Sequence, residues 1–166
     1  VHGLDVKESV LEEAKSKGYK NIYKINLNNT PLETSAIKNK YDHIIFADVL
    51  EHLVNPSNVL EKLKANLKPK GTVIISLPNV AFFLNRILLT LGNWNYTEFG
   101  TLDKTHLKFY TLKSGKEMVE SAGYDVLEVQ PYNQFGMLRY IDPLTKLFPG
   151  LFAYQFIIIA KMKPND

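Results

Sequence analysis

The sequence predicts an α/β protein with a doubly wound, mostly parallel sheet and helices on both faces. Short apolar runs typical of strands alternate along the chain with amphipathic stretches typical of helices. The run at 44–46 is continuously apolar, as in a strand that is covered on both faces. With 166 residues, 45% of them hydrophobic, the chain is long enough for one domain with a substantial core.

The N-terminal part predicts a strand, a helix and two further strands. A short apolar run ending at Asp5 or Val6 predicts the first strand, and Gly18 is a suitable C-terminal cap for the helix that follows. Residues 21–27 predict the second strand. A polar connection with a proline turn then leads to a strand at 41–47.

The next helix begins in Asn55-Pro56-Ser57, where Asn55 or Ser57 is expected to cap it. Its apolar face has the spacing of one side of a helix and consists of Val59, Leu60, Leu63 and Leu67. Pro69, Lys70 and Gly71 end this stretch and lead into a buried strand at 72–77.

The C-terminal part predicts one helix and two strands. One aromatic segment precedes the helix, and another lies between the two strands. Segment 81–110, called the insert below, is longer than a usual connection, and such segments often form lids or binding loops. Thr111 is expected to cap a helix that ends at Ala122-Gly123. A strand at 124–132 follows, and the last strand lies at 154–163. We expect a single domain over 1–166 with the insert at 81–110.

Composition argues against several functional classes. The chain has 20 Lys and Arg residues against 17 Asp and Glu residues, and they are scattered, which favours solvated helix faces over a nucleic-acid partner. The absence of cysteine excludes disulfides, thiolate metal sites and a cysteine nucleophile, and it fits a cytoplasmic location. Because Pro149 and Gly150 interrupt the apolar stretch at 147–160, we expect no membrane span. We also expect no targeting segment.

Polar residues crowd the end of the strand at 41–47, where open α/β sheets bind their ligands. Asp48, Glu51 and His52 stand at i, i+3 and i+4, so one helical turn would project all three to one side. Three interpretations stay open. The set could hold Mg²⁺ or another divalent ion. It could form a hydrogen-bonded cluster with His52 as a general base. His52 could also be purely structural.

Three blocks of the sequence form a recognisable set: GLDV at 3–6, YDHIIFADVLEHL with LKPKGTVIISLPN within 41–79, and LDKTHLKFYT at 102–111. Together they resemble the class I, Rossmann-like family of S-adenosylmethionine-dependent methyltransferases. The second block is similar to small-molecule O-methyltransferases of the ubiquinone-biosynthesis type. The resemblance implies a Rossmann-like fold whose last strand is antiparallel. It also implies an enzyme that methylates a small-molecule substrate, through oxygen, with S-adenosylmethionine as cofactor.

The family opens with a strand and a loop of the form acid-x-Gly-x-Gly-x-Gly, and this sequence has no such motif. The resemblance therefore implies a fold that lacks its first strand and helix, and we expect a truncated N-terminus. A chain without the glycine-rich loop should bind the cofactor weakly and could be inactive alone. The alternatives are a non-catalytic binding or interaction protein with a degenerate methyltransferase fold and, third, a nucleotide-binding oxidoreductase.

The resemblance implies a cofactor site at the strand ends. Asp5 would accept hydrogen bonds from the two ribose hydroxyls, which suits an acceptor-only carboxylate, although it would also suit NAD. The competing interpretation is that Asp5 caps the following helix. Asn26 and Leu27 would contact adenine or simply end a strand. Ala47 and Asp48 would lie at the methionine end of the cofactor, unless Asp48 is only an acid at a helix start.

His52 and His106 are the candidate catalytic residues. Methyl transfer to a hydroxyl needs an aligned acceptor and a base, and histidine titrates in a suitable range. His106 lies with Asp103 and Tyr110 in the loop before the helix that Thr111 starts, and it could instead hold the loop backbone against the sheet. The aromatic residues of the insert would line a substrate-side pocket or form the core of a lid; they are Trp94, Tyr96, Phe99 and Phe109.

Overall fold

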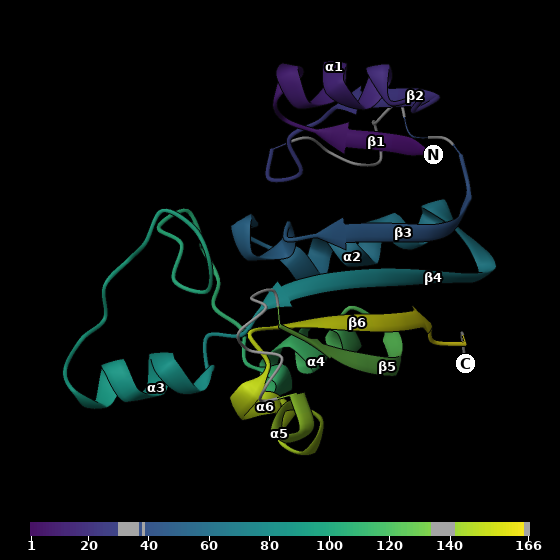
Figure 1. Ribbon diagram of the computed structural model, residues 1–166. Helices are drawn as coiled ribbons and strands as arrows, with labels where there is room; N and C mark the ends of the chain where they lie inside the picture. The colour runs from purple at the N-terminus through teal and green to yellow at the C-terminus, as the bar shows by residue number, and fades with distance from the viewer. Residues whose placement is uncertain (30–36, 38, 134–141, 165–166) are drawn as a thin grey trace.

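The computed structural model describes residues 1–29, 37, 39–133 and 142–164 (Figure 1). The strands are β1 (His2–Asp5), β2 (Asn21–Lys24), β3 (Tyr41–Ala47), β4 (Leu67–Pro78), β5 (Tyr124–Tyr132) and β6 (Gln155–Met162). The α-helices are α1 (Glu8–Ser16), α2 (Pro56–Leu63), α3 (Phe83–Thr90), α4 (Leu112–Ser121), α5 (Asp142–Leu147) and α6 (Pro149–Phe152). Two 3₁₀ turns, η2 (Leu50–His52) and η3 (Lys64–Asn66), flank α2.

The strands form two sheets. In the four-stranded sheet the order is β3-β4-β6-β5, where β3 and β4 are parallel and β6 runs antiparallel to both of its neighbours. β1 and β2 form a separate parallel pair. Figure 1 shows this pair beside β3, at the edge of the larger sheet. The expected α/β class and antiparallel last strand are confirmed.

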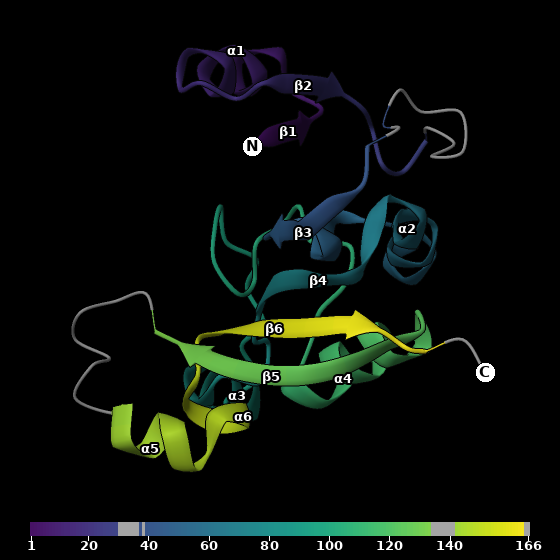
Figure 2. The same ribbon diagram turned by 90° about the vertical axis from the view of Figure 1, so that its right-hand side faces the viewer.

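One face of the four-stranded sheet carries the core. Figure 2 shows α2 and α4 on the same side of that sheet. Alternate side chains of β4 and β6 point toward these helices and are fully buried; they are Val73, Ile75, Leu77, Phe156, Ile158 and Ala160. All four residues of the expected apolar face at 59–67 join this cluster. The core therefore fixes the carboxyl end of β3, where the polar residues lie.

Helix termini match the sequence signals closely. Asn55 caps α2, because its Oδ1 accepts a hydrogen bond from the Asn58 amide at 3.2 Å. Thr111 caps α4 in a capping box with Ser114, and Gly123 follows the helix with a φ of 79°. Gly18, just after α1, has a φ of 86° as a C-terminal glycine should. Thr111 and Gly123 thus fix the two ends of α4, which directly follows the insert.

Two expectations for the strands were wrong. Ile45 was expected to be covered, but its side chain is 66% exposed, because no element of the described residues packs over it at the edge strand β3. The second strand ends at Lys24 and not at Leu27. The reason is local: Asn26 Oδ1 accepts from the Asn28 amide at 3.0 Å, and this bond turns the chain out of the strand.

None of the helices in the described residues has the length and apolar character needed to cross a membrane.

Candidate functional site

The backbone turns sharply where β3 ends. Asp48 has a φ of 52°, in the left-handed region that Asp tolerates better than most residues. Its Oδ1 accepts hydrogen bonds from the Ser76 hydroxyl at 2.7 Å and from the Gln155 side-chain amide. The Asp48 carboxylate is therefore directed at β4 and β6. The expectation that it shares one side of a helical turn with Glu51 and His52 was wrong, because a left-handed residue cannot begin a regular helical turn.

Glu51 is the unusual residue of this turn. Its side chain is fully buried, and neither carboxylate oxygen has a hydrogen-bond partner within the described residues. Burial, offset in part by the nearby main chain of Glu51 itself and assisted by the charges of Asp48 and Asp103, raises the pKa of Glu51 to about 8. An unpaired buried carboxyl costs free energy and is uncommon in folded proteins, so it calls for an explanation.

His52 is held by the insert. Its Nδ1 lies 3.1 Å from the carbonyl oxygen of Thr105. A carbonyl can only accept, so Nδ1 carries the proton in this contact, and Nε2 is left with a free lone pair.

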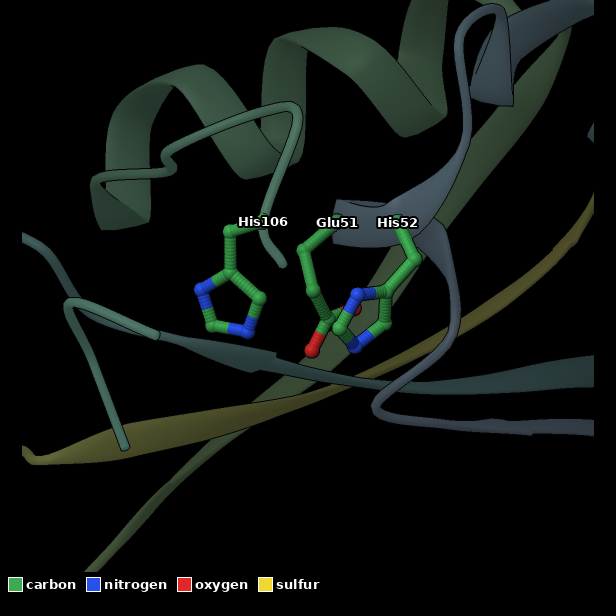
Figure 3. Close-up of side chains that lie close together, drawn as sticks. All are labelled: Glu51, His52 and His106. Carbon is green, nitrogen blue, oxygen red and sulfur yellow. The ribbon is translucent and has the colours of Figure 1, made fainter. Parts of the chain in front are cut away.

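The main chain of Glu51 holds the loop that carries His106. The Glu51 carbonyl accepts hydrogen bonds from the amides of Leu107 and Lys108, at 2.9 and 3.0 Å. The two imidazole rings then meet edge to face, with their centroids 4.9 Å apart (Figure 3). One interpretation of the sequence expected the loop to dock with His106 holding its backbone. The loop does dock, but through the main-chain amides of Leu107 and Lys108. His106 Nδ1 stays buried without a partner among the described residues.

The neighbours of His106 in the loop have structural roles. Asp103 Oδ1 accepts from both the amide and the hydroxyl of Thr105, each at 2.7 Å, and these bonds hold its pKa below the usual range. Tyr110 is buried, and its carbonyl accepts from the Val80 amide. Burial, followed by the nearby Glu51 charge, raises the pKa of Tyr110 to about 12. Neither residue is poised to take a proton at neutral pH.

Glu51, His52 and His106 form a compact set of potential metal ligands. Each offers one ligand atom, and these atoms all lie within 4.8 Å of one another. Ligand atoms around a bound zinc ion stand about 3–3.5 Å apart, so small side-chain movements would close the set. The residues therefore fit the divalent ion considered from the sequence, but with His106 in the place expected for Asp48.

The residues expected to bind the cofactor are half-buried or exposed. Asp5 ends β1 and accepts a hydrogen bond from the Lys7 amide at 2.8 Å, just before α1 begins. Asn26 is exposed in the turn after β2, and Leu27 is half-buried against the core cluster. Ala47, the last residue of β3, is exposed. Their positions at strand ends are as expected, and their roles stay predictions.

Asn28 was missed in the sequence. Its side chain accepts from the Val54 amide at 2.8 Å and donates to the His52 carbonyl at 3.2 Å. It therefore ties the end of β2 to η2 and joins the two halves of the site. The only available signal was an asparagine in a polar connection, which is typical of any turn.

Three of the four aromatic residues of the insert gather beside His106. Phe109 lies 6.0 Å from the His106 ring, and Trp94 and Tyr96 lie 5.9 and 6.2 Å from Phe109, measured between ring centroids. Phe99 does not join them and is 80% exposed. An open depression of about 640 Å³ lies elsewhere, between α3, α4 and α6, and contains none of the expected site residues.

Comparisons with solved structures show the same fold. The first is a SAM-dependent methyltransferase from Archaeoglobus fulgidus, with a TM-score of 0.62 and 18% identity over 96% of this chain and 75% of that one. The second is described as a putative S-adenosylmethionine-dependent methyltransferase from Listeria monocytogenes, with a TM-score of 0.62 and 18% identity over 99% of this chain and 80% of that one.

The chain is also similar in part to curated proteins that share one name. The "Ubiquinone biosynthesis O-methyltransferase" of Haemophilus ducreyi is 32% identical over 85 residues, which are 48% of this chain and 36% of the relative. The protein of the same name from Rickettsia typhi is 34% identical over 79 residues, 48% of this chain and 32% of the relative. The match thus spans about a third of these relatives. A family model described as "Methyltransferase domain" matches residues 2–129, and the chain belongs to this family of methyltransferases.

Proposed function

We propose that this chain carries the acceptor side, and part of the cofactor side, of an S-adenosylmethionine-dependent O-methyltransferase for small molecules. The observation that carries the proposal is the pairing of His52 with His106, from distant parts of the sequence, at the carboxyl end of β3. Membership of the methyltransferase family supports the reaction class. The names of the partial relatives favour oxygen in a small molecule as the acceptor.

The two imidazoles supply the base that a hydroxyl acceptor requires. When bound, S-adenosylmethionine supplies an electrophilic methyl group, whose S–C bond breaks as the O–C bond forms and whose sulfur keeps the electron pair. Burial lowers the pKa of His106 below its usual range, which favours the neutral ring at neutral pH. The neutral ring that faces His52 accepts the hydroxyl proton in this proposal. In the neutral form of His52, whose Nδ1 donates to the Thr105 carbonyl, Nε2 carries the lone pair and can serve the same purpose.

The rest of the site would align the two reactants. In this proposal the Asp5 carboxylate accepts the ribose hydroxyls, the turn at 26–27 contacts the adenine, and the backbone at Ala47 borders the methionine end. Asp48 supports that backbone through its bonds to Ser76 and Gln155. The aromatic group of the insert covers the acceptor, which would put segment 81–110 on the substrate side. Direct transfer requires this in-line arrangement and inverts the methyl carbon.

Cofactor binding tests the first half of the proposal. We expect weak but saturable binding of S-adenosylhomocysteine to the chain, measured by NMR titration, because the sequence lacks a glycine-rich loop motif. Replacing the acceptor-only Asp5 (Asp5→Ala) should weaken it by roughly 10-fold or more, as loss of charge-assisted hydrogen bonds does. Glu12→Ala, an exposed acid on α1, is the matched control. Equal affinity in Asp5→Ala and the control would remove Asp5 from the cofactor site.

Product analysis tests the second half. The protein is incubated with S-adenosylmethionine and matched panels of phenols, sugars and amines, and methylated products are identified by mass spectrometry. O-methylated products that decline strongly in His52→Gln would support the proposal. Methylation confined to amines would contradict the O-methyl assignment. No transfer, together with no binding of S-adenosylhomocysteine, would favour the non-catalytic alternative.

A further inference from the structure

We propose that Asn28 is a positioning residue that fixes the place of His52 and couples it to the turn at 26–28, which contacts the adenine in the proposed function. The identity of that ligand rests on the proposed function, whereas the contacts that carry the inference belong to the folded chain. Asn28 touches neither reactant and acts through His52 alone.

The two sheets depend on side chains for their alignment. Within the described residues β1 and β2 make no main-chain hydrogen bond to β3, and Figure 1 shows the pair as a separate unit beside that strand. At the strand starts, His2 Nδ1 lies 2.8 Å from the Tyr41 hydroxyl. At the strand ends, Asn28 contacts the main chain at the end of η2. Only the second of these contacts lies at the candidate site.

Asn28 completes the hydrogen bonding at the end of η2. A helical turn leaves its last carbonyls without partners inside the turn. The Glu51 carbonyl accepts from two amides of the insert, and the His52 carbonyl accepts from Asn28 Nδ2 at 3.2 Å. The Val54 amide, just past the turn, donates to Asn28 Oδ1 at 2.8 Å. One side-chain amide, which can donate and accept at once, therefore fixes the main chain that carries the His52 ring.

The ring of His52 is held by a different segment, the insert. Its Nδ1 lies 3.1 Å from the Thr105 carbonyl oxygen and 3.3 Å from the Thr105 hydroxyl. That hydroxyl donates its own proton to Asp103 at 2.7 Å, so both Thr105 oxygens are acceptors toward the ring. These bonds favour the tautomer with the proton on Nδ1. They require the His52 main chain to stay where Asn28 holds it, so a shift of that main chain would weaken them.

The turn that carries Asn28 is also bonded to the cofactor half of the site. The Asn28 amide donates to Asn26 Oδ1 at 3.0 Å, and the Ile25 amide donates to the Asp5 carbonyl at 3.1 Å. A ligand that moved Asp5 or Asn26 would therefore move Asn28 and, through it, His52. Contiguous contacts of this kind establish coupling only when a double substitution shows it, so the experiments below include one.

The tautomer of His52 is the readout, measured by NMR of the chain with ¹⁵N-labelled histidine at about pH 8, where an ordinary imidazole is neutral. Asn28→Asp keeps an acceptor for the Val54 amide but cannot donate to the His52 carbonyl, and Asn28→Ala removes both bonds. In each variant the Nδ1–H form of His52 should lose ground to the Nε2–H form by roughly 2- to 10-fold, the factor that one ordinary hydrogen bond produces. Unchanged His52 signals in both variants would overturn the proposal.

Two controls separate positioning from charge and from stability. Asn29→Asp adds the same charge at the next residue, which is also exposed. Tyr41→Phe removes the hydroxyl that contacts His2, a link between the two sheets at the strand starts. Both variants should keep the His52 tautomer of the unaltered chain. A change in Tyr41→Phe as large as the change in Asn28→Ala would mean that His52 responds to any loosening of the two sheets, which contradicts a specific role for Asn28.

A double substitution tests the coupling to the cofactor half. Asn26→Ala removes the acceptor of the Asn28 amide, so it should alter the His52 tautomer in the unaltered chain. In the Asn28→Ala background the same substitution should add nothing, because the link to His52 is already absent. Additive effects of the two substitutions would show that the turn and His52 are independent and would refute the coupling.

A measurement without substitutions guards against misfolded variants. A scalar coupling across the hydrogen bond, between the Val54 amide nitrogen and the side-chain carbonyl carbon of Asn28, reports the contact directly by NMR in the unaltered chain. We expect this coupling to be observed, and its absence from the folded chain would overturn the proposal. None of these readings uses a cofactor or an acceptor, so failure of the role of Asn28 and failure of the proposed function are separate results.

Discussion

Glu51, His52 and His106 are brought together beside a four-stranded sheet with a continuous core, whereas Asp5 ends one strand of a two-stranded sheet and Asn26 follows the other. In the smaller unit neither strand contains a fully buried residue, and α1 buries only Leu11. The larger sheet shares one cluster with α2 and α4. Both units present polar residues at strand ends, but of these residues Glu51, in the packed unit, is fully buried, whereas Asp5 is half-buried.

The contrast between the two sheets is tested most directly by a cavity in the core of the four-stranded one. Phe156 is 1% exposed in the main cluster, so Phe156→Ala should lower the free energy of unfolding by about 3–5 kcal/mol. Val10 on α1 is 42% exposed, and Val10→Ala should change stability by no more than about 0.5 kcal/mol. Urea unfolding monitored by circular dichroism measures both. Similar losses would show that the two units share one core and that the contrast is mistaken.

The second prediction concerns how the free energy of unfolding of the metal-free chain depends on pH. The pKa of Glu51 is raised to about 8 in the folded state, so between about pH 4.5 and 8 the folded state keeps a proton that the unfolded state has lost. Raising the pH through this window therefore favours unfolding. The Glu51 contribution should fall by up to about 1.4 kcal/mol per pH unit, and Glu51→Gln should remove it.

Urea unfolding with a chelator, between about pH 5 and 7.5, measures this slope. The control is Glu12→Gln, an exposed acid on the smaller unit, which should keep the dependence of the unaltered chain. A Glu51→Gln variant with the same slope as the control would mean that Glu51 is not buried as a neutral acid in solution. The contrast between Glu51 in the packed unit and the acids of the smaller unit would then disappear.

The smallest expected effect compares the two helix starts. Thr111 caps α4 through a reciprocal bond with Ser114, and Thr111→Ala should cost about 1 kcal/mol. Lys7 occupies the same position before α1 and makes no side-chain cap, so Lys7→Ala should be neutral within about 0.5 kcal/mol. Thermal unfolding of both variants is the measurement. An equal cost at both positions would contradict the view that α1 begins without side-chain support.

The local rules predicted much of the fold. Asn55, Thr111, Gly18 and Gly123 marked helix ends correctly, because capping depends on residues only a few positions apart. The prediction that Ile45 is covered was wrong for the opposite reason. An apolar residue in a strand indicates that the strand forms, but whether a neighbour covers that residue depends on elements far away in the sequence.

The candidate site shows the same division. His52 and His106 were both candidates in the sequence, but they are 54 positions apart, and no spacing rule relates them. Asp48, Glu51 and His52 were grouped because a regular helix would align them. The left-handed φ of Asp48 breaks that alignment, and the Ser76 and Gln155 bonds that hold Asp48 come from β4 and β6. The grouping assumed a helix that the chain does not form.

By itself the sequence determined the α/β class, the ends of the helices and the strand-end location of the polar residues, because periodicity and capping act over a few residues. Tertiary structure alone decided that Glu51 is buried without a hydrogen-bond partner in the described chain, that His106 takes the position expected for Asp48, and that Asp5 is only half-buried. These outcomes depend on which surfaces pack against each other. Packing brings together residues that no local pattern connects.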